Sequence, residues 1–162
     1  MGDAVELRTS NPDDADAIRR LTREAYAKWV PIVGREPLPM TADYEAAVRS
    51  HRFDLLSVDG ALAALIETVD EGDQLLIENV AVALAFQGRG LGRRLLAHAE
   101  DLARTLGRGR IRLYTNALME ANIALYRRLG YAIDREEIAP DGRRAVHMSK
   151  DLGSRPGAVR GE

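Results

Sequence analysis

The stretch Gln87-Gly88-Arg89-Gly90-Leu91-Gly92-Arg93 lies between an apolar run that ends at Val82 and a helical pattern that begins at Leu91. Glycines at such a connection let the backbone approach a ligand closely. The first turn of the helix that follows offers unpaired N–H groups and the positive end of the helix dipole. This segment is therefore a candidate cradle for phosphate groups.

Two common phosphate-binding loops do not fit the spacing of this segment. A dinucleotide fingerprint starting at Gly88 needs glycine or alanine at position 93, where Arg93 stands, and the preceding strand belongs to an antiparallel meander. The nucleotide-triphosphate loop ends in Gly-Lys-Ser or Gly-Lys-Thr, and neither triplet occurs in the sequence. The pattern that remains is Gln-x-x-Gly-x-Gly, formed by Gln87, Gly90 and Gly92.

Downstream of this loop, the sequence predicts a helix followed by alternating strand and helix patterns. Apolar residues recur at helical spacing from Leu91 to Leu106, and Gly107 is placed to end that helix. We then expect a strand over 111–116, a helix over 119–129, a strand over 131–138, a turn at 140–142 and a strand over 143–150.

Upstream of the loop, we expect a strand over 4–8, a helix capped by Asn11 and running to about Lys28, a proline-rich loop over 31–40, and a helix over roughly 42–51 capped by Thr41. Asp59-Gly60 predicts a hairpin between strands 53–58 and 61–69, and a third strand follows over 75–82. The order β-α-α-β-β-β-α-β-α-β-β indicates an α/β or α+β fold with a mixed sheet.

Composition favours one ordinary globular domain. The chain has 162 residues, 23 Lys plus Arg against 25 Asp plus Glu, a formal charge of -2 and no cysteine. These values argue against nucleic acid as the main partner and exclude a thiol nucleophile. We expect one domain over 1–152, a frayed tail over 153–162, and a cytoplasmic protein with no membrane partner, because the N-terminus is acidic and no apolar run approaches ~18 residues.

Beyond the glycine loop, several segments resemble the GNAT superfamily of acetyl-CoA-dependent N-acetyltransferases. The pattern Gln-x-x-Gly-x-Gly is its second signature motif, 5–18 looks like its first strand and helix, 77–82 like its central strand, and 122–131 like its last helix and following strand. The resemblance implies a mixed, mostly antiparallel central sheet with helices on both faces, and acetyl-CoA as cosubstrate.

The resemblance also assigns cofactor-binding residues. The end of the central strand would pair with the pantetheine arm through Val80, Ala81 and Val82. The pyrophosphate would be held by the loop residues Gln87, Gly88, Arg89, Gly90, Leu91, Gly92 and Arg93. Either guanidinium, of Arg89 or of Arg93, could equally be solvated surface.

Glu78 is the candidate base. Strand alternation places Leu76, Glu78, Val80 and Val82 on one face, so Glu78 is an isolated carboxylate in an apolar row. Such a group suits proton removal from an ammonium substrate, directly or through water. The alternative is that Glu78 pairs with a nearby arginine and has no chemical role. The Val82 amide is a candidate donor to the thioester oxygen.

Tyr126 and Asn122 lie four residues apart, on one side of the predicted helix. The resemblance implies that Tyr126 is the general acid for the coenzyme A sulfur, against the alternative of a core tyrosine. It implies a pantetheine or phosphate contact for Asn122. A common family pattern puts asparagine seven residues before the tyrosine, where this chain has Met119.

The acetyl acceptor is expected to lie against the segment 26–44, where Tyr26, Trp29 and Tyr44 could form an aromatic wall. A core role for Trp29 is the alternative. We expect direct transfer to a small-molecule amine, with a protein or peptide amine, or a non-catalytic acyl-CoA-binding module, as alternatives. No metal is expected, because the three histidines have no metal-binding spacing. The sequence leaves the oligomeric state open, a homodimer included.

Overall fold

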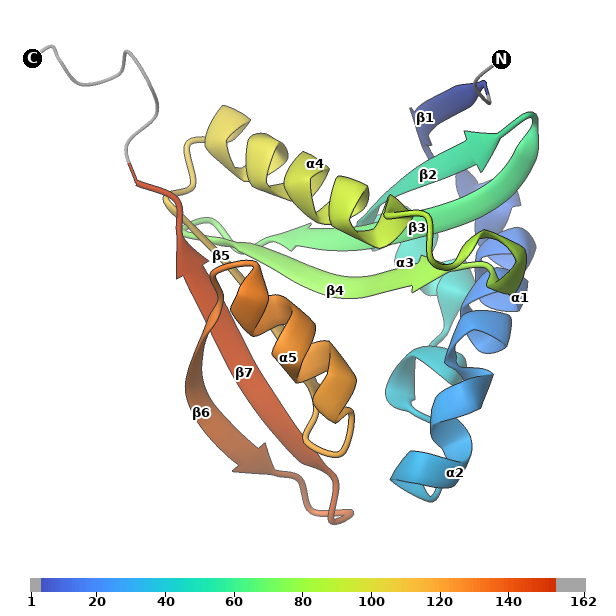
Figure 1. The fold of residues 1–162 in the computed structure, drawn as a ribbon. Helices are drawn as coiled ribbons and strands as arrows, with labels where there is room; N and C mark the ends of the chain where they lie inside the picture. The colour runs from blue at the N-terminus through green and yellow to red at the C-terminus, as the bar shows by residue number, and fades with distance from the viewer. Residues whose placement is uncertain (1–3, 154–162) are drawn as a thin grey trace, which may run out of the picture. The chain divides into compact units, whose positions relative to one another are not determined.

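The computed structural model describes residues 4–153, which form two compact units. Unit 1 comprises residues 4–69 and 78–97, and unit 2 comprises residues 70–77 and 98–153. Seven strands follow one another in the hydrogen-bonded order β1-β2-β3-β4-β5-β7-β6 (Figure 1). Strand β4 (Leu75–Val82) and helix α4 (Leu91–Thr105) each contribute residues to both units.

The strands of unit 1 begin with β1 (Val5–Thr9), β2 (Arg52–Val58) and β3 (Ala61–Asp70), and both successive pairs are antiparallel. The β2–β3 connection is the predicted hairpin. Its two central residues, Asp59 and Gly60, have φ angles of 51° and 84°. Positive φ at both positions matches the twist of the flanking strands, which is why Asp-Gly favours this turn.

Helices α1 (Ala15–Tyr26) and α3 (Tyr44–Ser50) cover the core of unit 1. The predicted cap is confirmed: the Asn11 side chain accepts a hydrogen bond from the Asp13 N–H, and the Asp14 carboxylate accepts one from the Asn11 N–H. This capping box orders a 3-10 turn, Pro12–Asp14, that leads into α1. The buried face of α1 then packs against β2, β3 and β4 through Ile18, Leu21, Phe53, Leu55, Leu65 and Ala81.

Two expectations for the segment before β2 are wrong. The proline-rich stretch begins with a helical turn, α2 (Val30–Val33), rather than a loop. Pro31 is tolerated there because the first helical positions need no N–H donor, and Gly34, with φ of 88°, ends the turn. The cap of α3 is Asp43, whose carboxylate accepts from the Ala46 N–H, rather than Thr41.

Strand β4 presents alternate side chains to helices on its two faces. Ala81 belongs to the core that α1 covers, whereas a Cβ at Gly92 in α4 would lie 3.8 Å from Val82 Cγ2. Neighbouring residues of a strand point to opposite faces of a sheet. Unit 1 therefore has helical residues on both faces of β4, as expected from the sequence.

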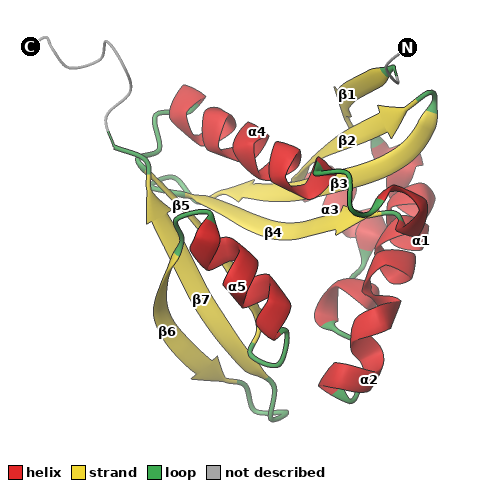
Figure 2. Ribbon diagram, viewed as in Figure 1, coloured by secondary structure: helices red, strands yellow, loops and turns green. Residues whose placement is uncertain are grey.

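Unit 2 is built from β5 (Arg110–Asn116), α5 (Glu120–Arg128), β6 (Ala132–Ile138) and β7 (Arg144–Asp151), which Figure 2 draws by secondary structure. The first half of β4 pairs with β5 in parallel, and β7 pairs antiparallel with both β5 and β6. The last strand therefore lies between two earlier ones, an order that the sequence pattern does not reveal.

The mixed, mostly antiparallel sheet with helices confirms the predicted fold class. The expectation of one domain over 1–152 stays a prediction, and the predicted frayed tail lies outside the described residues except for Gly153. Within 4–153, no helix combines the length and apolar character needed to cross a membrane.

Candidate active site

A buried polar network ties helix α1 to strand β4 in unit 1. The Asn79 side chain is buried, accepts a hydrogen bond from the Tyr26 hydroxyl at 2.8 Å, and donates to Thr22 Oγ1 at 3.3 Å and to the Tyr44 hydroxyl at 3.4 Å. The Tyr26 hydroxyl also lies 3.3 Å from the carbonyl oxygen of Val80. Tyr26 is predicted to contact the acetyl acceptor. Its hydroxyl also forms hydrogen bonds to β4, the strand predicted to bind the cofactor.

The turn that follows β4 is held by side chains as well as by backbone. The Glu24 carboxylate accepts from the Leu84 N–H at 2.8 Å, and the Gln87 amide donates to the Val82 carbonyl at 3.0 Å. The Ala83 N–H donates to the Ala63 carbonyl of β3 at 2.8 Å. Consecutive peptide groups after Val82 are therefore fixed before the glycine loop begins.

The glycine loop has the backbone conformation that its sequence indicates. Gly88 and Gly90 have φ angles of 84° and 80°, a region that side-chain-bearing residues rarely adopt, and a Cβ on either would meet nothing within 4 Å. The Arg94 N–H donates to the Gly90 carbonyl at 3.1 Å, which starts α4 directly after the loop. The N–H groups of the first turn of α4 have no earlier carbonyl within the helix to bond, so they suit an anion.

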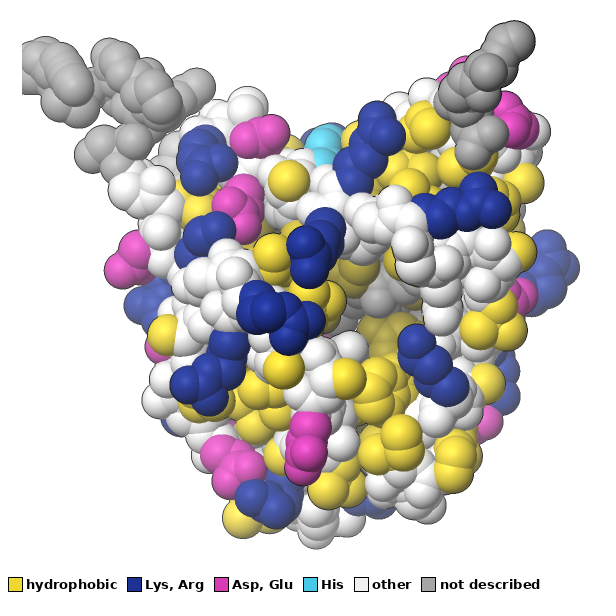
Figure 3. All heavy atoms as spheres, in the orientation of Figure 1, with side chains coloured by type: hydrophobic (Ala, Val, Ile, Leu, Met, Phe, Trp, Pro, Cys, Tyr) yellow, Lys and Arg dark blue, Asp and Glu magenta, His cyan; other side chains and the backbone are white. Residues whose placement is uncertain are grey.

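Basic side chains accompany the loop. Arg89 and Arg93 are exposed, and the Arg89 guanidinium carbon lies 5.1 Å from the centre of the Phe86 ring. This contact packs the Arg89 side chain against Phe86 while leaving its charge at the surface. Lysine and arginine side chains are drawn in dark blue in Figure 3.

Glu78 is half-buried on β4, and its charge acts on two buried groups of unit 1. Burial raises the pKa of Glu67, the His51 side chain lowers it, and the charge of Glu78 raises it further. Burial likewise raises the pKa of Tyr44, to which the charges of Glu67 and Glu78 contribute. The Glu67 carboxylate lies 2.6 Å from His51 Nδ1. In unit 1, therefore, the Glu78 and Glu67 carboxylates lie close enough to interact electrostatically, and His51 contacts Glu67.

Tyr126 lies on α5 in unit 2, partly buried against Tyr131. Their ring centres are 6.0 Å apart with an interplanar angle of 63°, an edge-to-face contact. Burial raises the pKa of Tyr126 to about 12, so the phenol stays protonated throughout the neutral range. The buried Tyr131 hydroxyl has no hydrogen-bond partner among the described residues.

Asn122 is half-buried one helical turn before Tyr126. Its amide nitrogen lies 3.8 Å from the sulfur of the buried Met119, which Thr115 Oγ1 also approaches at 3.6 Å. Met119, at the position where the pattern noted in the sequence analysis has asparagine, thus accepts weak hydrogen bonds from Asn122 and Thr115.

The predicted aromatic wall is only partly present. Trp29 is half-buried, and the Lys28 ammonium lies 5.8 Å from the centre of its ring. Tyr44, in contrast, is 1% exposed, and its hydroxyl donates to the Pro39 carbonyl at 2.6 Å. Tyr44 is therefore a core residue rather than part of a wall, because α3 begins with its side chain facing β2.

The predicted site residues fall into two sets. Unit 1 brings together Tyr26, Trp29, Glu78, the end of β4 and the glycine loop, and unit 2 carries Asn122 and Tyr126. Sequence reasoning missed Glu24, Lys28, Glu67 and Asn79. For Glu24 and Lys28 the available signal was their four-residue spacing, which places both on one side of the predicted helix, and spacing alone does not name the partner.

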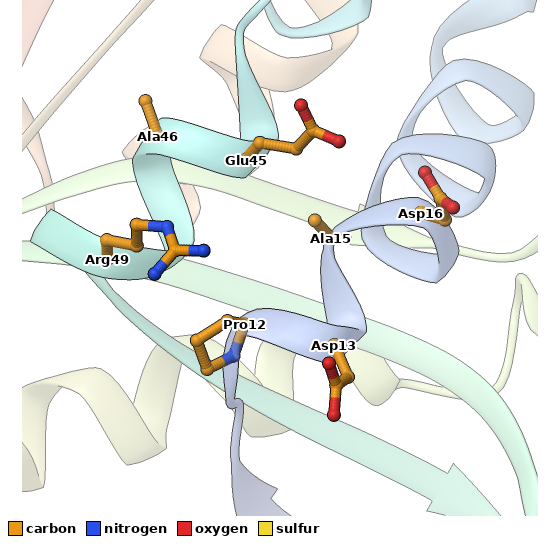
Figure 4. A pocket seen from close by; sticks show the side chains of 7 residues that line it. All are labelled: Pro12, Asp13, Ala15, Asp16, Glu45, Ala46 and Arg49. Atoms are coloured by element: carbon orange, nitrogen blue, oxygen red, sulfur yellow. The ribbon is translucent and has the colours of Figure 1, made fainter.

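A pocket of about 650 Å³ in unit 1 lies away from these residues (Figure 4). It is lined from α1, the turn before it and α3 by Pro12, Asp13, Ala15, Asp16, Glu45, Ala46 and Arg49. None of the predicted site residues lines it. Among residues 4–153, no three His, Asp or Glu side chains are grouped so as to hold a metal ion.

Comparison with known proteins identifies the family of this chain. The model of the acetyltransferase (GNAT) family matches residues 15–131. Streptothricin acetyltransferase of Streptomyces lavendulae is 29% identical over 91% of this chain and 95% of its own. The structure of the ribosomal-protein-S18-alanine N-acetyltransferase from Escherichia coli has a TM-score of 0.75 at 23% identity, covering 96% of this chain and 98% of that one.

A structure of yncA from Salmonella typhimurium with its cofactor acetyl-CoA has a TM-score of 0.69 at 19% identity, covering 94% of this chain and 96% of that one. The structural likenesses show the shared fold, and the family match spans most of the chain, including β4, the glycine loop and α5. The chain therefore belongs to the acetyltransferase (GNAT) family.

Proposed function

We propose that this protein is an N-acetyltransferase that moves the acetyl group of acetyl-CoA directly to the primary amine of a small molecule. The observation that carries the proposal is the segment from Val82 to Arg93, where a braced turn, two left-handed glycines and the start of a 15-residue helix follow one another. That segment offers backbone donors to a pyrophosphate without side chains in the way.

The residues present fit the cofactor. A Cβ at Gly88 or Gly90 would meet no protein atom within 4 Å, so the loop is shaped by its backbone and leaves that space for a ligand. The pyrophosphate would be bound by residues 87–93, and the pantetheine arm by the backbone of Val80, Ala81 and Val82, with Asn122 as a further contact. When bound, acetyl-CoA supplies an acetyl group activated as a thioester.

Glu78 is the proposed base. It accepts a proton from the ammonium form of the acceptor, and the neutral amine then attacks the carbonyl carbon. The N–C bond forms, the C–S bond breaks, and the Val82 N–H stabilises the negative charge that develops on the oxygen. The absence of cysteine supports direct transfer, because no cysteinyl acetyl-enzyme can form.

Tyr126 is the proposed donor to the departing sulfur. Its pKa of about 12 lies above the ~8.5 typical of a thiol, so transferring the phenol proton to a free thiolate would be uphill. We therefore assign Tyr126 a hydrogen bond that stabilises charge on the sulfur. Tyr126 keeps its proton, and the second proton that the attacking nitrogen loses passes to solvent.

A small-molecule acceptor is supported by the streptothricin acetyltransferase relative, which matches this chain nearly end to end. Tyr26 and the half-buried Trp29 supply aromatic surface for a cationic amine. A protein N-terminus is the second candidate, because the Escherichia coli neighbour acetylates the alanine of a ribosomal protein.

Release of the coenzyme A thiol should be measured across a panel of free amines that includes streptothricin, alongside peptides with Ala or Ser at the N-terminus. We expect at least one free amine to exceed every peptide in kcat/KM by about tenfold or more. A higher kcat/KM for the peptides would indicate that the acceptor is a protein N-terminus. Binding of coenzyme A without thiol release from any acceptor would indicate a non-catalytic module.

A further inference from the structure

Helix α1 reaches the turn after β4 through two charged side chains of opposite sign. Glu24 and Lys28 are exposed and lie one helical turn apart, so they project from the same side of α1 and its 3-10 extension, Ala27–Trp29. The Glu24 carboxylate accepts from the Leu84 N–H at 2.8 Å. The Lys28 ammonium donates to Gln87 Oε1 at 3.3 Å.

Lys28 acts on the backbone through Gln87. The Gln87 side chain uses its oxygen for Lys28 and its nitrogen for the Val82 carbonyl, at 3.0 Å. A side-chain amide whose oxygen and nitrogen are both engaged has one preferred orientation. The chain Lys28–Gln87–Val82 therefore fixes the peptide group after Val82, while Glu24 fixes the one before Leu84.

Neither charge is needed for the stability of the core. Both side chains are exposed, and hydrogen bonds at exposed positions contribute little to folding. Glu24 also has the wrong sign to bind a phosphate, so its place beside an anion-binding loop calls for another role. Ordering a binding segment in advance removes an entropy cost that the ligand would otherwise meet.

We propose that Glu24 and Lys28 are positioning residues that hold the turn 82–87 in the conformation that receives coenzyme A. The inference rests on the proposed function, since it takes the segment 80–93 as the cofactor site. It adds that the affinity for the cofactor is set partly by α1, a helix outside the family's signature loop.

The test is calorimetric titration of the full chain with coenzyme A, which needs no acceptor and no turnover. Glu24→Ala and Lys28→Ala should each weaken binding by about tenfold, because coenzyme A must then order part of the turn when it binds. Glu24→Gln keeps an acceptor for the Leu84 N–H and Lys28→Arg keeps a donor for Gln87, so both should bind within about threefold of wild type. Glu45→Ala, an exposed change on α3, is the matched control and should bind like wild type.

Two further readouts separate positioning from other roles. Melting temperatures should stay within about 2 °C of wild type, and in turnover the KM for acetyl-CoA should rise while kcat is unchanged. In a Gln87→Leu background, Lys28→Ala should have no further effect on coenzyme A binding, because Lys28 acts through Gln87. An additive effect would mean that Lys28 touches the ligand itself, and the positioning role would be wrong.

The inference is overturned if both alanine variants bind coenzyme A like wild type, or if Glu24→Gln loses as much affinity as Glu24→Ala. If the proposed function is wrong, the result is distinguishable, because the wild-type chain itself would then not bind coenzyme A.

Discussion

At the scale of single residues, Tyr126 is the clearest test of the chemistry. Its hydroxyl is proposed to stabilise the departing sulfur, so Tyr126→Phe should lower kcat by about a hundredfold with little change in the KM for acetyl-CoA. Tyr131→Phe is the matched control, because it removes a neighbouring hydroxyl that has no hydrogen-bond partner among the described residues. Steady-state kinetics decide the question, and equal rates for Tyr126→Phe and wild type would contradict the assignment.

The raised pKa of Tyr126 has a consequence for the pH profile. A phenol with a pKa of about 12 keeps its proton until the pH approaches that value, whereas an ordinary tyrosine is half ionised at pH ~10. We therefore expect kcat of the wild-type enzyme to show no decline between about pH 8 and pH 10. If kcat falls over that range in wild type but not in Tyr126→Phe, the pKa of Tyr126 is that of an ordinary tyrosine and is not raised.

The role of Glu78 is also tested by steady-state kinetics as a function of pH. If it deprotonates the acceptor, Glu78→Gln should lower kcat/KM by about a hundredfold at neutral pH. The defect should shrink as the pH rises toward the pKa of the substrate amine, because the amine then loses its proton without help. A loss of equal size at every pH would favour a purely structural role for Glu78.

At the scale of elements, residues that act locally were predictable from the sequence. Asn11 caps the 3-10 turn that leads into α1, Asp59-Gly60 forms the hairpin, and Gly88 and Gly90 adopt the left-handed conformation that their loop needs. Each depends on neighbours in the chain. Partners distant in sequence were not predictable: the Asn79 contacts with Thr22 and Tyr44 span 57 and 35 residues. The place of β7 between β5 and β6 is likewise a property of the assembled sheet.

The glycine loop supplies a prediction at this scale. Gly90→Ala introduces a side chain at a φ of 80° and should cost about 1 kcal/mol of unfolding free energy, together with a loss of coenzyme A affinity. Gly109→Ala is the control, because its φ lies outside the left-handed region and its Cβ would meet nothing within 4 Å. Urea unfolding and calorimetry measure both effects. A Gly90→Ala variant as stable as Gly109→Ala would show that the loop tolerates another conformation.

At the scale of the whole molecule, the buried Glu67 carboxyl, which contacts the half-buried His51, makes stability depend on pH. Burial is the main cause that raises the pKa of Glu67 above its unfolded value of ~4.3, so the folded state binds more protons just above that pH. The contribution of Glu67 to stability is therefore greatest below pH ~4 and declines as the pH rises. Relative to Glu67→Gln, wild type should lose stability in urea as the pH rises above ~4.3. A relative gain would contradict the raised pKa.

The central claim is that acetyl transfer to an amine occurs directly, in a complex that holds both substrates. Initial velocities of thiol release should be measured while acetyl-CoA and the best amine of the panel are varied together, with mass spectrometry of the product. We predict intersecting double-reciprocal lines and one acetyl group gained by the amine for each thiol released. Parallel lines, or thiol release without an acetylated amine, would contradict the claim.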